Sequence, residues 1–95
     1  MKLFKQSENY SIEGTVENGW KISGNVTLES SSAIYMHIIV NDASDKYIGE
    51  INYNKPSEEG ANINMGYSVS EANRDILTTY ADTVVDFVLQ ELPTL

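Results

Sequence analysis

The residues best suited to chemistry in this sequence are four carboxylates in its last third. Glu71 and Asp75 are four residues apart, and so are Asp82 and Asp86. Side chains at this spacing lie next to one another on a helix, so each pair would present two carboxylates together. Such pairs can exchange protons with a substrate, bind Mg²⁺ or Ca²⁺, or attract a basic protein.

Catalysis and metal binding are the weaker interpretations of these carboxylates. Acid catalysis at neutral pH needs a carboxyl group whose pKa is raised by burial, and nothing in the pattern predicts that these side chains are buried. Dedicated metal sites usually take ligands from several elements or from one tight loop. We therefore expect no metal ion and no other cofactor. The remaining alternatives are a solvated surface and a partner-binding surface made of Glu71, Asp75, Asp82 and Asp86.

His37 is the only histidine and lies in the apolar run AIYMHIIV, residues 33–40. A half-buried structural histidine is the favoured interpretation. A base paired with a carboxylate such as Glu50 is the alternative, since imidazole titrates near neutral pH. One histidine and scattered serines do not define a nucleophilic triad, which is recognised by its geometry. The sequence thus favours a protein that is not an enzyme.

Two further groups of residues have a structural and a functional interpretation. Residues 41–45 (NDASD) resemble part of a calcium loop but lack its spacing and its distal glutamate, so they predict a turn. Tyrosines are numerous, and we expect Tyr35, Tyr47 and Tyr53 on the sheet face away from the helix, with Trp20 near a hairpin end. They would stabilise the sheet or form a recognition or dimer surface.

The net charge of −8 is distributed unevenly. Residues 56–95 hold seven acids and one base, whereas residues 1–55 hold seven acids and five lysines. The lysines are scattered, so direct binding to nucleic acid or to an anionic membrane is disfavoured and a basic protein partner is favoured. No signal peptide or apolar run of membrane-spanning length is evident, which predicts a cytoplasmic protein.

The first two-thirds of the chain predicts β-strands. Residues 10–16 and 20–28 alternate between apolar and polar types, and Asn18-Gly19 between them is typical of a hairpin. Only a three-residue loop, 17–19, brings the large apolar side chains of both strands to one face. It pairs Val16 with Trp20, Gly14 with Ile22, Ile12 with Gly24, and Tyr10 with Val26.

Three more strands and one helix are predicted after this hairpin. Residues 33–40 are apolar on both faces, as in a central strand whose two faces are partly covered, and residues 47–53 and 61–67 alternate again. From Ser70 the apolar period becomes helical, and Pro93 marks the end. The inner face of this helix is predicted to consist of Leu77, Tyr80, Ala81, Val84, Phe87, Val88 and Leu92, whereas Leu89 falls on the acidic side.

These patterns predict one α+β domain spanning residues 1–95: a twisted antiparallel sheet of about five strands, arranged as a meander, with an amphipathic C-terminal helix across one face. The expected function is that of a small acidic binding protein, such as an adaptor, accessory factor or inhibitor, without catalytic activity. One alternative is a self-associating domain, including a homodimer, that uses a sheet edge or the aromatic sheet face. Another is a small-molecule-binding domain or minor enzyme with a site near His37.

Overall fold

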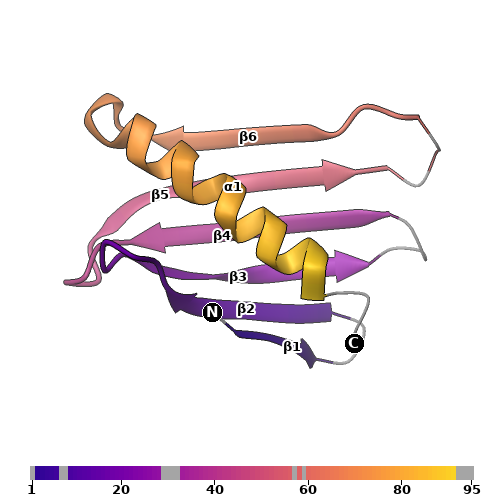
Figure 1. Cartoon of the computed structure of the whole chain (residues 1–95), viewed down its shortest axis with the longest axis horizontal. Coiled ribbons are helices and arrows are strands. Elements are labelled where there is room, and N and C mark those ends of the chain that lie inside the picture. The colour runs from indigo at the N-terminus through magenta and orange to yellow at the C-terminus, as the bar shows by residue number, and fades with distance from the viewer. Residues whose placement is uncertain (1, 7–8, 29–32, 57, 59, 92–95) are drawn as a thin grey trace.

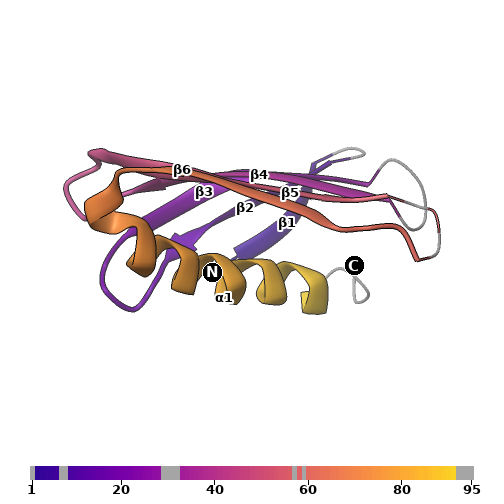
Figure 2. The same ribbon diagram turned by 90° about the horizontal axis from the view of Figure 1, so that it is seen from above.

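Alternating apolar and polar residues build an antiparallel sheet, and a helix packs across one of its faces (Figures 1 and 2). The computed structural model describes residues 2–6, 9–28, 33–56, 58 and 60–91. The strands are β1 (Lys2–Gln6), β2 (Asn9–Thr15), β3 (Lys21–Leu28), β4 (Ile34–Asn41), β5 (Tyr47–Lys55) and β6 (Asn64–Val69). A 3₁₀ turn, η1 (Glu71–Asn73), leads into the helix α1 (Arg74–Glu91).

The six strands follow one another in the sheet in chain order, and every neighbouring pair is antiparallel. The predicted α+β meander with a C-terminal helix is therefore confirmed. The strand beyond the expected five is β1, which pairs with β2 at one edge of the sheet. Its sequence, KLFKQ, lacks the regular apolar alternation that predicts the other strands.

The hairpin between β2 and β3 has the predicted register. Gly14 lies opposite Ile22, Ile12 opposite Gly24 and Tyr10 opposite Val26. The Val16 N–H donates to the Trp20 carbonyl over 2.9 Å, which closes the three-residue loop. Gly19 has a φ of 93°, the left-handed conformation that favours glycine at this position.

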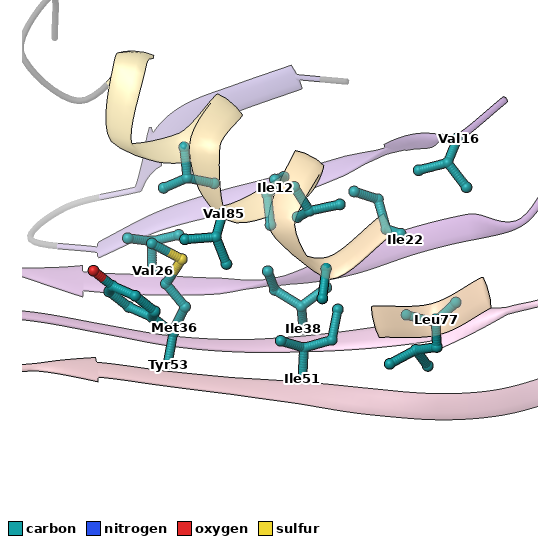
Figure 3. Close-up of a cluster of buried hydrophobic side chains, with 14 of the residues drawn as sticks. Ile12, Val16, Ile22, Val26, Met36, Ile38, Ile51, Tyr53, Leu77 and Val85 are labelled. Carbon is teal, nitrogen blue, oxygen red and sulfur yellow. The ribbon is translucent and has the colours of Figure 1, made fainter. Parts of the chain in front are cut away.

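Strand β5 departs from the predicted alternation because its pairing with β4 is irregular. The register shifts between Val40 and Asn41, so that Gly49 and Tyr47 face consecutive residues of β4 and Ile48 has no partner in the ladder. Tyr47 therefore lies on the face of the sheet away from the helix, whereas Tyr53, opposite Met36, lies in the core and is 4% exposed (Figure 3). The prediction that Tyr53 shares the outer face with Tyr47 is wrong, because a bulge changes which face a residue occupies.

The core lies between the sheet and α1, which crosses the sheet diagonally (Figure 1). Leu77, Ala81, Val84, Val85 and Val88 of the helix are buried, and they pack on the inner side chains of β2 to β5 (Figure 3). Burial of these apolar surfaces is the main stabilising contribution in a chain of this size. Gly49 allows a close approach of both β6 and the helix, since a Cβ there would overlap the Ser68 carbonyl oxygen and lie 3.0 Å from Leu77 Cδ1.

The helix differs in detail from its prediction. Val85 is fully part of the core although the predicted inner face omits it, and Leu89 is half-buried against the core instead of lying among the acidic residues. Tyr80 and Phe87 are half-buried at the margin of the interface. Ser70, where the helical period begins, directly precedes η1 and makes no side-chain capping bond to the backbone. The predictions for Leu92 and Pro93 lie outside the described residues.

The opposite face of the sheet carries no described element, as Figure 2 shows for the ribbon. Tyr35 and Ile39 of β4 are 42% and 36% exposed there, although the apolar run predicted cover on both faces. The second apolar row of β4 is thus an exposed surface of the described structure. We call this surface the open face.

Candidate functional site

The four predicted carboxylates are all exposed, but they do not belong to one helix. Asp75, Asp82 and Asp86 lie in α1, and Glu71 lies in the preceding turn η1. At 100° per residue, the three aspartates fall within about 40° of one another around the helix axis. We call these three residues the acidic face of α1, with Glu71 as a separate neighbour toward the start of the helix.

The acidic face has little basic charge near it. Arg74 Nε lies 3.5 Å from Asp75 Oδ1, and the Asp75 side chain is 92% exposed. Among the described residues, Asp82 and Asp86 have no ion-pair partner, and the last turn of α1 holds no base. Within the described part of the chain, the negative charge of Asp82 and Asp86 is therefore not neutralised by an ion pair.

Strand β6 places an aromatic side chain beside this acidic surface. Tyr67 lies opposite the core residue Ile51, which puts it on the helix side of the sheet, and it is 41% exposed. Partial burial raises the pKa of the Tyr67 hydroxyl, and the nearby charge of Asp82 adds to this increase. Tyr67 therefore lies within electrostatic range of Asp82. Sequence spacing alone could not reveal this relation, because it depends on how the helix is rotated on the sheet.

The open face contains a hydrogen-bonded cluster of His37, Glu50 and Tyr47. His37 Nε2 lies 2.5 Å from Glu50 Oε2, and the Tyr47 hydroxyl donates to Glu50 Oε1 over 3.0 Å. His37 and Glu50 are partly exposed, at 37% and 32% of their side chains. The structure therefore brings together the histidine and the carboxylate that the sequence suggested as a pair, and adds Tyr47.

Electrostatics keeps Glu50 in its ionised form. The hydrogen bonds from His37 and then from Tyr47 lower the pKa of the Glu50 carboxyl below its ordinary value. The same carboxylate raises the pKa of the Tyr47 hydroxyl, which stays protonated as the donor. Glu50 Oε2 accepts the hydrogen bond from His37 Nε2, so Nδ1 is the ring nitrogen left to meet another group. The cluster can bind a hydrogen-bonding ligand or orient the imidazole as a base.

Tyr47 was missed as a member of this cluster for a structural reason. Residues three apart on a regular strand lie on opposite faces, so Tyr47 and Glu50 are not expected to meet. The bulge in β5 reverses the orientation of Tyr47 and makes the contact possible. No feature of the local sequence marks the bulge.

A shallow polar hollow of about 550 Å³ lies at one end of β2 and β3. Lys21 Nζ bonds Asp45 Oδ1 over 2.8 Å at its margin, with both side chains well exposed. The remaining lining residues are Glu13, Gly14, Thr15, Ile22, Ser23 and Asn41. Its open shape and mixed charge do not define a particular ligand.

The turn predicted for residues 41–45 is present, and its first residue, Asn41, also ends β4. Asp42 Oδ1 accepts hydrogen bonds from the N–H groups of Ser44 and Lys46, and Asp45 adopts a φ of 66°. Within the described part of the chain, no group of three or more histidines or acids is arranged to hold a metal ion. No described helix combines the length and the apolar character that crossing a bilayer requires.

Comparison with known proteins gives no family to which this site could be related. The chain matches no protein-family model, no curated protein and no solved structure.

Proposed function

We propose that this protein is a small acidic binding protein without catalytic activity, acting as an adaptor, accessory factor or inhibitor of a basic protein. The acidic face of α1 would be the surface that meets the partner, with Glu71 beside it. The observation that carries the proposal is the exposure of Asp75, Asp82 and Asp86 on one side of a well-packed helix, with Arg74 as the one basic neighbour among the described residues.

Three like charges on one helix face make the helix slightly less stable, by a few tenths of a kcal/mol for each close pair. The same arrangement attracts lysine and arginine over a distance of roughly 10 Å at moderate salt. Such attraction increases the association rate more than it increases the affinity. A partner that normally binds phosphates could be occupied in this way, since carboxylates also accept the hydrogen bonds of arginine and lysine.

The test compares two variants with equal net charge. One replaces Asp75, Asp82 and Asp86 by asparagine; the other replaces Glu13, Glu17 and Glu58, which are exposed outside α1, by glutamine. Affinity capture from the host lysate, at low and high salt, is then followed by association kinetics with the captured protein. We expect the first variant and high salt to reduce the association rate about tenfold or more, while the control changes it little. Equal behaviour of the two variants would show that the acidic face is not the binding surface.

The cluster on the open face supports a second candidate function, the binding of a small polar molecule near His37. The supporting observation is that Glu50 is oriented by two hydrogen bonds while both it and His37 remain partly exposed. A ligand screen followed by NMR chemical shifts of the β4 and β5 amides tests this function. If His37→Ala leaves the affinity of every detected ligand unchanged, the site is not at His37.

A further inference from the structure

Strand β6 forms an open edge of the sheet. It pairs with β5 on one side, and no described segment pairs with it on the other (Figure 1). An edge strand presents unpaired backbone N–H and C=O groups, which can hydrogen-bond to another extended chain. Four of the six residues of β6 are exposed. The backbone at this edge is therefore a potential acceptor of one more strand.

The two edges of the sheet differ in how well they are protected against such pairing. Edge strands that avoid other chains usually carry lysine or proline, or are short. The edge strand β1 contains Lys2 and Lys5. In contrast, residues 61–69 (ANINMGYSV), which include all of β6, contain no charged residue and no proline.

The acidic residues near β6 favour one kind of chain as the added strand. Glu71 and Asp75 lie two and six residues after the end of β6, and Asp82 of α1 is within electrostatic range of Tyr67. A second copy of the protein, with its own net charge of −8, would bring like charges together across a β6 pairing. An extended segment rich in lysine or arginine would instead meet opposite charge.

We propose that β6 binds an extended basic segment of the partner by strand addition, extending the sheet by one strand. This inference rests on the proposed function, because it specifies which part of a basic partner is bound. Side chains of an added strand alternate between the two sides of the sheet. Basic side chains on the helix side meet Asp82 and Tyr67, and an arginine there can stack on the tyrosine ring. The intervening residues lie beside Asn64 and Gly66 and are expected to be small or polar.

The first experiment separates strand pairing from charge attraction. The probe is a peptide of about ten residues that alternates lysine and threonine, compared with the same peptide carrying N-methyl groups on alternate backbone amides. Both have equal charge, but the methylated one cannot pair along one edge. We expect methylation on the pairing edge to weaken binding about tenfold or more, measured by fluorescence anisotropy. Binding of the unmodified peptide should also slow amide hydrogen exchange in β6.

The possible outcomes distinguish this inference from the proposed function. Equal binding of the two peptides, lost when Asp75, Asp82 and Asp86 are replaced by asparagine, would overturn strand addition and leave the acidic binding surface intact. Absence of binding by either peptide would also overturn strand addition, while the capture experiment would still decide the proposed function. Slower exchange confined to α1, with none in β6, would count against strand addition as well.

Two substitutions at Asn64 distinguish a basic segment from a second copy of the protein as the strand that pairs with β6. Asn64 is an exposed residue of β6, so neither Asn64→Lys nor Asn64→Glu should change the melting temperature by more than about 2 °C. Asn64 lies beside the threonines and not beside the lysines of the peptide, so a charge there acts on the lysines through the electrostatic field. We therefore expect the lysine variant to weaken peptide binding and the glutamate variant to strengthen it, more at low salt than at high salt. Pairing with a second copy would be weakened by both, because each places like charges at the interface. If light scattering shows that the wild type is a dimer and that both substitutions dissociate it, the strand that pairs with β6 belongs to a second copy and the proposal of a basic segment is wrong.

Discussion

Trp20 and Tyr80 pack ring against ring, with centroids 6.2 Å apart and planes inclined by 60°. Trp20 lies at the end of the loop between β2 and β3, and Tyr80 lies on α1, so the contact joins the hairpin to the helix. Tyr80 and Asp82 are on opposite flanks of α1, about 160° apart at 100° per residue. The contact with Trp20 on one flank therefore helps to set the rotation of α1, which places Asp82 on the other flank within electrostatic range of Tyr67.

Loss of this aromatic contact should loosen the helix on the sheet. We expect Tyr80→Ala to reduce the free energy of unfolding by about 2 kcal/mol, of which about 1 kcal/mol comes from the ring pair itself. Thr83→Ala, at an exposed position of the same helix, is the matched control. Urea denaturation followed by Trp20 fluorescence and by circular dichroism measures both. If a double-mutant cycle with Trp20→Leu shows no coupling, the ring contact does not stabilise the structure.

The inner and outer faces of α1 should respond differently to charge. Val84 is fully buried, so Val84→Asp places a carboxylate in the core. We expect it to reduce the free energy of unfolding by about 4 kcal/mol or more, which would leave most molecules of so small a domain unfolded. Asp82→Lys, on the exposed side, should leave the fold intact. Circular-dichroism melts compare the two. A cooperative melt for Val84→Asp near the wild-type temperature would show that the helix is rotated differently on the sheet.

Two glycines provide a matched test of strand packing. A Cβ at Gly24 would lie 2.8 Å from Ile38 Cα and would overlap the carbonyl oxygen of His37, both in the backbone of β4, whereas a Cβ at Gly66 meets open space. We expect Gly24→Ala to cost about 2 kcal/mol or more, because strand backbone cannot move aside cheaply. Gly66→Ala should be neutral or stabilise by about 0.5 kcal/mol through the unfolded chain. Equal effects in thermal denaturation would contradict the register of β3 and β4.

The hydrogen bonds to Glu50 predict a particular dependence of stability on pH. Because the pKa of Glu50 is lower in the folded protein than in the unfolded chain, its contribution to stability is present above the unfolded value of 4.5 and is lost as the pH falls through the folded value. Tyr47→Phe removes one donor and should raise the pKa of Glu50, which the ¹³C shift of its carboxyl reports. The variant should lose stability at neutral pH and converge with the wild type in acid.

Tyr35→Phe is the control for this prediction, since Tyr35 lies on the same open face, whereas the described partners of Glu50 are His37 and Tyr47. It should leave the Glu50 titration unchanged. A Tyr47→Phe protein that titrates like the wild type would mean that the tyrosine does not bond Glu50 in solution.

The local sequence was sufficient to predict the register of the β2–β3 hairpin, because one turn determines it. Asn18-Gly19 and the need to keep large side chains on one face determined every pair in the hairpin, and those pairs are present. The carboxylate spacing in α1 likewise predicted their shared exposed face. Each of these features depends on residues close together in the chain, whose geometry the strand and helix periods determine.

The features that the sequence did not predict depend on distant contacts. The bulge between β4 and β5 reverses Tyr47 and separates it from Tyr53. The rotation of α1 about its axis is determined by its packing on the sheet. This rotation buries Val85 and places Asp82 within electrostatic range of Tyr67. Neither the bulge nor the helix rotation has a local sequence signature. For the helix, a helical wheel gives the angular spacing of residues but not which side will pack on the sheet.

The order of the strands has a consequence for folding. Each strand pairs with its neighbour in the chain, so the sheet can grow one hairpin at a time with short loops to close, which favours rapid folding. The helix that covers the apolar side follows all six strands. The apolar side of a newly formed sheet is therefore exposed until α1 docks, and at this stage the chain is most vulnerable to aggregation.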